Sequence, residues 1–276
     1  MDGNRNDLTN TNELFSFFAN FGNGVYNFVN SINKIGESIA SFMIEAKPAI
    51  EGLLVASEWA NAAKTCEENQ WVLFEIPLDI IREIYNNPTH CDNILYEYYT
   101  ANSNENLKKL FERYRGHSQL QHNSAALSET FDCFLNGKYH RMIALSLIAI
   151  LDGVLARIAN NGNTQWLDRL KCFDNATDGM TIEEIFDLYP GLESRQLLML
   201  MWTFDAIVNF AAPTIDNKGK YDREFKGKEP PIMNRHWIMH GRSTRELTNV
   251  DCIKLFVFLF AMLKLDDFRK VIEATL

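Results

Sequence analysis

Apolar residues recur at helical spacing along most of the chain. In residues 14–42 they return every three or four positions, which predicts a long amphipathic helix with a phenylalanine-rich face. Further helices in the first half are predicted over residues 48–63, 78–85, 94–99 and 105–115. The short apolar run 71–76 has the length of a strand, but Pro77 after it favours a bend between helices.

The second half has the same periodicity. It predicts helices over residues 124–135, 138–160, 192–210 and 249–274. The helix over 138–160 is apolar on nearly all sides, so we expect most of its surface to be buried. Asn136 and Gly137 form a stop signal before this helix, and Thr248 with Asp251 forms a cap for the last helix.

No alternating strand pattern of convincing length interrupts these helices. The sequence therefore predicts an all-α fold, a helical bundle of roughly eight to ten helices with short connections. A polar break over residues 116–123 separates an N-terminal helical region, residues 1–122, from a C-terminal helical domain, residues 123–276.

The composition is that of a folded globular protein: the chain has 276 residues, of which 46% are hydrophobic and 23% are charged. The formal net charge of -9 counts against a broad nucleic-acid-binding surface, although it leaves room for a local basic groove. The five cysteines are odd in number, scattered and without a CxxC pair. They predict reduced thiols rather than a disulfide framework or a zinc site.

The polar N-terminus has no feature of a signal peptide. The longest apolar runs, residues 142–151 and 255–263, have about half the length that a membrane span needs. Both fall inside predicted helices. We therefore expect a cytoplasmic protein with no membrane contact.

Candidate chemistry concentrates in residues 230–241, where an arginine and two histidines occur within six positions. Arg235 is a fixed cation that can bind a phosphate through two N–H groups, and His240 has the side chain best suited to proton transfer near neutral pH. Their separation of five positions corresponds to about 140° on an ideal helix. The two side chains therefore converge only if the helix ends or kinks at Gly241, or if a second copy of the chain contributes.

Two other interpretations of this stretch stay open. His236 and His240 are four positions apart and could share a zinc ion, but Trp237 stands where the HExxH pattern has glutamate, and no third ligand is evident. Alternatively, Arg235 and His240 are ordinary polar residues near a helix end, since a similar arginine–histidine pair occurs by chance elsewhere in the chain.

The order Asn-Arg-His-x3-His-Gly in residues 234–241, followed by a polar turn and a long apolar helix, resembles the motif of the HEPN superfamily. Residues 135–153 contain a Gly-x-Tyr turn, an apolar helix and an acidic residue before glycine. They are similar to the block that precedes the motif in HEPN-like proteins of bacterial defence and abortive infection systems. The resemblance covers about residues 124–276 and implies a helical domain that dimerises with its two motifs facing each other.

This resemblance implies a metal-independent endoribonuclease that uses no cofactor and acts as a toxin or phage-defence effector. In the implied mechanism, His240 is the general base or acid for attack by the RNA 2′-OH. Arg235 binds the scissile phosphate and stabilises its developing charge. His236 or Asn234 orients the phosphate or the histidine, and the products are a 2′,3′-cyclic phosphate and a 5′-OH.

Asp152 matches the acidic position of the upstream helix in this resemblance. It is expected either to pair with Arg235 or to fix a histidine tautomer, and the alternative is a surface acid beside Arg157. At the start of the same helix, His140 and Arg141 are further candidates to approach the site.

Basic residues near the motif are expected to form a rim for the RNA backbone. They are Arg242, Arg245, Lys218 and Lys220. Alternatively, these basic residues simply lie in a solvated loop. The expected partners are RNA, a second copy of the chain in a homodimer, and an antitoxin or sensor protein. A second functional hypothesis is a non-catalytic HEPN-like protein that binds a nucleotide or a protein partner.

Overall fold

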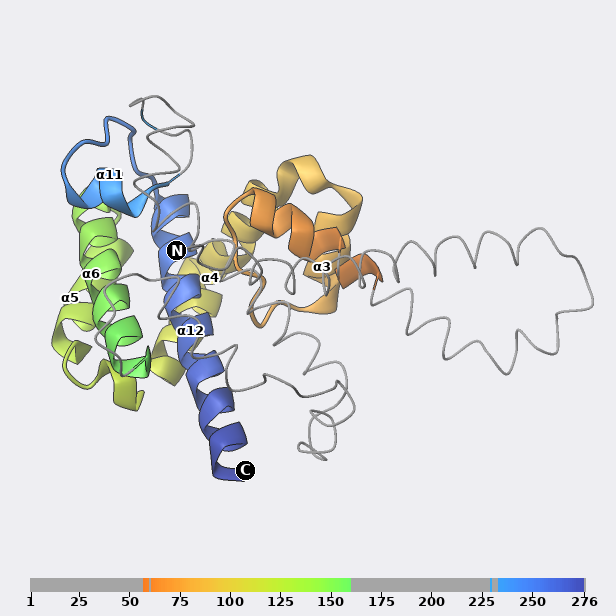
Figure 1. The fold of residues 1–276 in the computed structure, drawn as a ribbon. Coiled ribbons are helices and arrows are strands. Elements are labelled where there is room, and N and C mark those ends of the chain that lie inside the picture. Colours follow the sequence, from red (N-terminus) through yellow and green to blue (C-terminus); the bar gives the residue numbers. More distant parts are fainter. Residues whose placement is uncertain (1–56, 60, 160–228, 230–232, 276) are drawn as a thin grey trace, which may run out of the picture.

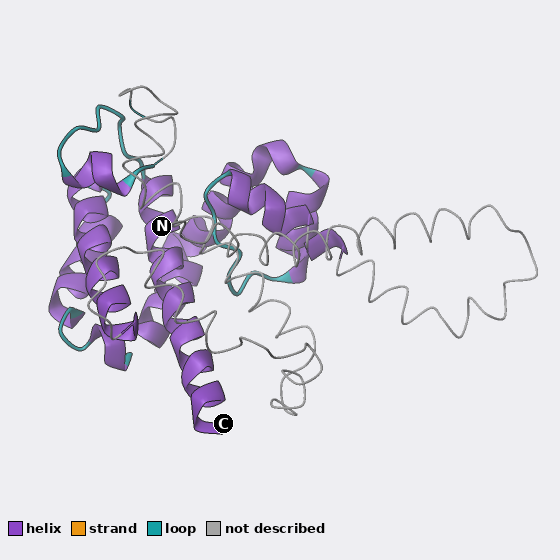
Figure 2. Cartoon of the chain, in the orientation of Figure 1, coloured by secondary structure: helices purple, strands orange, loops and turns teal. Residues whose placement is uncertain are grey.

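The computed structural model describes residues 57–59, 61–159, 229 and 233–275 (Figure 1). Every regular element within these residues is a helix, as Figure 2 shows, so the predicted all-α fold is confirmed for this part of the chain. The helices predicted over residues 14–42 and 192–210 lie outside the described residues, as do Lys218 and Lys220.

The first half contains helical residues 57–59 and 61–68, followed by α3 (Leu78–Asn86), η1 (Pro88–His90) and α4 (Cys91–Tyr114). Residues 71–76 form an irregular bend between helices, as predicted. Trp71, Leu73 and Ile76 of this bend are buried. The run is therefore apolar because its side chains enter the core, and not because it forms a strand.

The helix α4 consists of two segments joined at a kink. Residues 102–104 have left-handed φ angles between 51° and 66°, a conformation that asparagine adopts more readily than most residues. The side-chain amide of Asn106 donates a hydrogen bond of 2.8 Å to the carbonyl oxygen of Tyr98 across the kink. The two short helices predicted over residues 94–99 and 105–115 correspond to these two segments.

The second half contains η2 (Ser118–Leu120), α5 (Ser124–Leu135), α6 (His140–Ala159), α11 (Arg235–Met239) and α12 (Asn249–Thr275). The end of α5 is where the sequence predicts it, and Gly137 after it has a φ of +66°, which glycine adopts without strain. The helices α5 and α6 lie side by side, and α12 packs against α6 and α4 (Figure 1).

The hydrophobic core is organised around α12. Residues 251–263 are all buried, so this stretch of helix has neighbours on every side. The ring of Phe256 contacts Phe131 of α5 edge to face at 5.3 Å, and Phe260 stacks on Tyr114 of α4 at 5.8 Å. These aromatic pairs hold α12 between the helices of the first and second halves.

We expected the helix over residues 138–160 to be buried on most sides. Fewer than half of the residues of α6 are buried, several others are half-buried, and Met142 and Ala149 are exposed, so α12 is the more completely enclosed helix. None of the described helices combines the length and the apolar character that crossing a membrane requires.

Core residues come from both sides of the predicted boundary at residue 122. Trp59 and Ile81 precede this boundary, whereas Leu127 and Phe258 follow it, and all four belong to one hydrophobic cluster. The two regions therefore share a core within the described residues, and their division into 1–122 and 123–276 stays a prediction.

The predicted cap at the start of α12 is present. The Oδ2 atom of Asp251 accepts hydrogen bonds from the Thr248 backbone N–H at 2.8 Å and from the Thr248 hydroxyl at 3.0 Å. Its Oδ1 atom contacts Nη2 of Arg245 at 2.6 Å. Asp251 is 2% exposed and therefore has no access to water. These donors supply the hydrogen bonds that water would otherwise give to its carboxylate.

Replacing Asp251 with alanine should lower the free energy of unfolding by about 2 kcal/mol, because both the cap and the partner of Arg245 are lost. Urea denaturation of the purified variant measures this change. The exposed neighbour Glu246 provides a control, since Glu246→Ala should change stability by less than about 0.5 kcal/mol. Equal effects of the two substitutions would contradict the role given to Asp251.

Candidate functional site

The helix α11 begins where Asn234 caps it. The side-chain oxygen of Asn234 accepts a hydrogen bond of 3.1 Å from the Trp237 N–H, and its carbonyl oxygen accepts one of 3.0 Å from the Ile238 N–H. Asparagine is a favoured residue at this position because its side chain satisfies an N–H that has no partner inside the helix. Asn234 is 5% exposed and therefore serves as a buried structural cap at the start of the motif.

The same helix ends at a glycine. Gly241 has a φ of +66°, its N–H donates to the Ile238 carbonyl oxygen at 3.1 Å, and the Arg242 N–H donates to the Trp237 carbonyl oxygen at 2.9 Å. This pair of bonds is the Schellman motif, in which glycine is preferred because other residues resist a left-handed backbone. His240 consequently lies one residue beyond the last helical position. The helix ends before Gly241, which is one of the two conditions under which we expected Arg235 and His240 to converge.

Arg235 and Asp152 come together although 83 residues separate them in sequence. Nη2 of Arg235 lies 3.3 Å from Oδ1 of Asp152, and α11 packs on α6. Both side chains are partly exposed, at 28% and 38%. A pair of this kind contributes little stability, about 0 to 1 kcal/mol, but it orients the guanidinium group.

This contact bears on the roles that the sequence left open for Asp152. The predicted pairing with Arg235 is present in the structure. The guanidinium of Arg157 is directed elsewhere, because it donates to the Gln119 carbonyl oxygen at 2.6 and 3.0 Å and to Oδ1 of Asn123 at 2.7 Å. Arg157 therefore anchors the turn before α5, and Asp152 is placed to act on the motif.

His240 is exposed at the end of the motif, whereas the side chain of His236 lies outside the described residues. The predicted rim residues differ from one another. Arg242 is exposed, but the guanidinium of Arg245 is engaged by buried Asp251 and is only 32% exposed. Arg245 thus has a structural role, whether or not it also contacts RNA.

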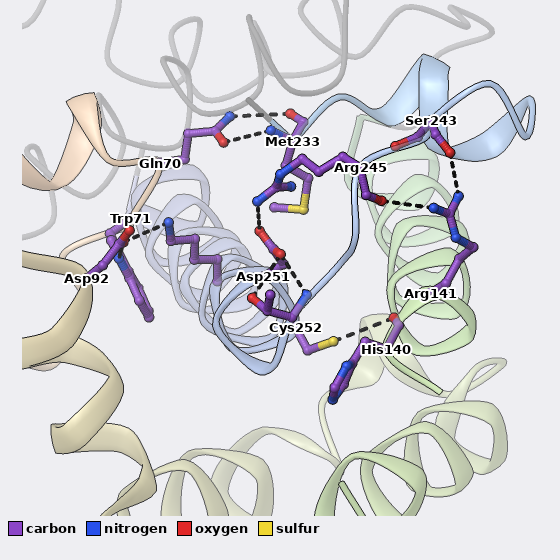
Figure 3. A network of polar contacts seen from close by, with 12 residues as sticks. Gln70, Trp71, Asp92, His140, Arg141, Met233, Ser243, Arg245, Asp251 and Cys252 are labelled. Atoms are coloured by element: carbon purple, nitrogen blue, oxygen red, sulfur yellow. Dashed lines mark hydrogen bonds and ion pairs between the residues drawn. The ribbon is translucent and has the colours of Figure 1, made fainter. Parts of the chain in front are cut away.

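Two long-range clamps hold the segment that carries the motif (Figure 3). The side-chain amide of Gln70 bonds both backbone groups of Met233, accepting from its N–H at 2.9 Å and donating to its carbonyl oxygen at 3.3 Å. Arg141 of α6 donates to the carbonyl oxygens of Ser243 and Arg245, each at 2.9 Å. The backbone is therefore fixed immediately before and after α11.

A third clamp is Glu229, whose carboxylate binds the turn after the motif. Its carboxylate accepts hydrogen bonds from the Ser243 hydroxyl, from the Thr244 N–H at 2.7 Å and hydroxyl at 2.6 Å, and from the Arg245 N–H at 3.3 Å. Partial burial by itself raises the pKa of Glu229, but these donors outweigh it and lower the pKa to about 2. The ionised carboxylate thus binds the turn strongly at neutral pH.

Gln70 and Glu229 position the motif, although no pattern in the sequence indicates it. Gln70 is separated from its partner by 163 positions, so no local pattern could indicate the contact. Glu229 lies in a loop of mixed charge whose net excess is small. Its only distinguishing signal is the nearby Ser243-Thr244 pair, which supplies hydroxyl donors.

The structure also contains a cleft of about 490 Å³ away from these residues, between the end of α4 and α12. Arg115, His117, Lys264 and Asp267 are among its lining residues. Nδ1 of His117 accepts a hydrogen bond of 3.2 Å from the Gln119 N–H, and its Nε2 lies 2.8 Å from Asp267. Both ring nitrogens are therefore engaged, and this histidine lacks the free nitrogen that a general base needs.

Among the described residues, no group of three or more His, Cys, Asp and Glu side chains is arranged to hold a metal ion. Comparisons of the chain with family models, with curated proteins and with solved structures found no match. The chemistry that the described site offers is a guanidinium oriented by a carboxylate, with an exposed imidazole five positions later, at the end of a short, clamped helix.

Replacing Glu229 with glutamine should lower the melting temperature at pH 7, because a neutral amide binds the four donors less strongly. The pKa of Glu229 in the folded protein, about 2, is below the value of about 4.3 expected in the unfolded chain. The carboxylate therefore stabilises the fold fully above about pH 5, and this contribution is lost as the pH falls toward 2.

Thermal melts of both proteins between pH 3 and 7 measure the effect, and the difference should shrink at the acidic end. The exposed acid Glu129 on α5 supplies the control, because Glu129→Gln should leave the pH dependence unchanged. A constant difference between wild type and Glu229→Gln at all pH values would show that ionisation of Glu229 does not hold the turn.

Proposed function

We propose that the protein is a metal-independent endoribonuclease of the HEPN type. One observation carries the proposal: Arg235 starts a clamped helix and is oriented by Asp152, while His240 is exposed just past the end of that helix. The order of residues in the motif and in the segment before it supports this assignment, because both resemble the HEPN superfamily.

Arg235 is proposed to bind the scissile phosphate. A guanidinium presents its N–H donors in a planar fork, so it can bind two phosphate oxygens at once. Fixed donors of this kind stabilise the charge that develops on the phosphate during the reaction. Asp152 is then a positioning residue that holds the guanidinium before RNA arrives.

His240 is proposed to transfer protons. Cleavage by the 2′-OH requires a base that removes its proton and an acid that protonates the departing 5′ oxygen. The new bond joins the 2′ oxygen to phosphorus and the bond to the 5′ oxygen breaks, which leaves a 2′,3′-cyclic phosphate and a 5′-OH. We infer that a second copy of the chain supplies the other histidine, in a homodimer whose motifs face each other.

This activity suits a toxin or phage-defence effector that acts in the cytoplasm and is restrained by an antitoxin or a sensor protein. The net charge of -9 favours a second candidate, a non-catalytic HEPN-like protein that binds a nucleotide or a protein partner. The two candidates differ in a direct measurement, because only the first predicts RNA cleavage that depends on His240.

Replacing His240 with alanine should reduce RNA cleavage at least about 100-fold, because one proton-transfer group is lost. The assay follows cleavage of labelled RNA in the presence of EDTA and identifies the cyclic phosphate by mass spectrometry. His240 is exposed, so the melting temperature should stay close to that of the wild type. His122→Ala removes another exposed histidine and should leave the rate unchanged.

Cleavage by His240→Ala at the wild-type rate would refute the proposed mechanism. A strict requirement for added metal would also refute it. If wild-type protein binds RNA, a nucleotide or a protein partner but cleaves no RNA, the non-catalytic candidate is supported instead.

Asp152→Asn should slow cleavage between about 3- and 30-fold, because the guanidinium of Arg235 is held less firmly. Its effect should nearly vanish in an Arg235→Ala background, since a positioning residue acts only through the group it positions. Single-turnover rates of the two single variants and the double variant form the cycle. Asp132→Asn, at an exposed position of α5, is the matched control, and additive effects would contradict the proposed role of Asp152.

A further inference from the structure

Two cysteine thiols meet in the part of the core formed by the first half of the chain. Cys66 lies near the end of helical residues 61–68, and Cys91 is the first residue of α4. Their Sγ atoms are 3.8 Å apart, and the residues are 0% and 1% exposed. A disulfide bond is about 2.05 Å long, so the sulfur atoms need to approach by only about 1.7 Å to form one.

The residues beside the two thiols are held in place. The Trp71 N–H donates to the Cys66 carbonyl oxygen at 2.7 Å. The indole N–H of Trp71 donates to Asp92 at 2.6 Å, and Figure 3 shows these two side chains together. Lys254 of α12 contacts the same carboxylate at 2.9 Å. Because Asp92 follows Cys91 directly, these contacts keep the two thiols facing each other.

The environment of the pair also controls how fast it can react. The hydrogen bond with Cys91, followed by burial, raises the pKa of Cys66 well above its usual value. A protonated, buried thiol is a poor nucleophile, so oxidation has to proceed through local opening of the surrounding helices. The exposed Cys133 has no such protection and is the expected site of faster, unspecific oxidation.

We propose that Cys66 and Cys91 form a reversible oxidation site that hydrogen peroxide converts into a disulfide. The sulfur of one thiol attacks peroxide, the O–O bond breaks, and a sulfenic acid and one water form. The second thiol attacks that sulfur, the S–S bond forms, and a second water leaves. The two sulfurs together lose two electrons, and these electrons reduce the peroxide to water.

The disulfide would restrain the part of the chain that anchors the motif. It closes a loop between residues 25 positions apart and joins the end of helical residues 61–68 to α4. Gln70 follows Cys66 by four positions and bonds both backbone groups of Met233. Oxidation therefore reduces local opening at this anchor. The proposal concerns the thiols alone and holds whether or not the protein cleaves RNA.

The test starts from reduced full-length protein, exposes it to hydrogen peroxide, removes the peroxide, and then unfolds the protein in guanidinium chloride with iodoacetamide to block the remaining thiols. Peptide mapping should recover Cys66 joined to Cys91, with the mass lowered by two hydrogen atoms, and dithiothreitol should abolish this product. Because the crosslink constrains the unfolded chain, the melting temperature should rise by roughly 5 °C or more. Cys133→Ser should keep both effects, and Cys66→Ala should lose both.

Hydrogen exchange tests the connection to the motif, and amides in residues 233–238 should exchange more slowly in the oxidised protein. The oxidation site is refuted if Cys66 and Cys91 are both recovered as blocked free thiols after Cys133 has been oxidised. A disulfide that joins either of them to another cysteine also refutes it. Unchanged exchange in residues 233–238 after the crosslink has formed would refute the restraint on the anchor.

Discussion

The enclosure of α12 dictates where the neighbouring helices lie in the described part of the chain. A helix that is buried on every side over residues 251–263 can exist only if other elements cover all of its faces. The rings of Phe256 and Phe260 pack against α5 and α4, and α6 covers a further side. The positions of these helices are therefore set by the need to keep water away from one central element.

Two buried charged residues on α12 determine which neighbouring segments pack beside it. Asp251 and Lys254 are buried, and a buried charge is costly unless a partner of opposite charge meets it. Asp251 therefore requires Arg245, which fixes the turn after the motif, and Lys254 requires Asp92, which fixes the start of α4. The hydrophobic surfaces decide that the helices pack, and these charges decide where the neighbouring loops lie.

Features with partners close in sequence could be predicted, because helical periodicity and caps depend on residues three to five positions apart. The α12 cap formed by Thr248 and Asp251 and the end of α5 near Gly137 are of this kind. The pairing of Asp152 with Arg235 followed from a resemblance and not from spacing. The contact between Gln70 and Met233 could not be predicted, because only the folded core brings the two residues together.

Two cations at the candidate site, Arg235 and Arg245, are paired with carboxylates, and this limits how an anionic substrate can bind to them. Arg235 faces Asp152 and Arg245 faces Asp251, so a phosphate at either guanidinium competes with a carboxylate already in place. The competition is unequal, because the side chain of Asp152 is 38% exposed and that of Asp251 is only 3% exposed. Water can solvate Asp152 when its partner turns to a phosphate, whereas Asp251 would be left buried without a counter-charge. Arg235 is therefore the cation that can exchange partners, and Arg245 is the one that has to stay where the fold holds it.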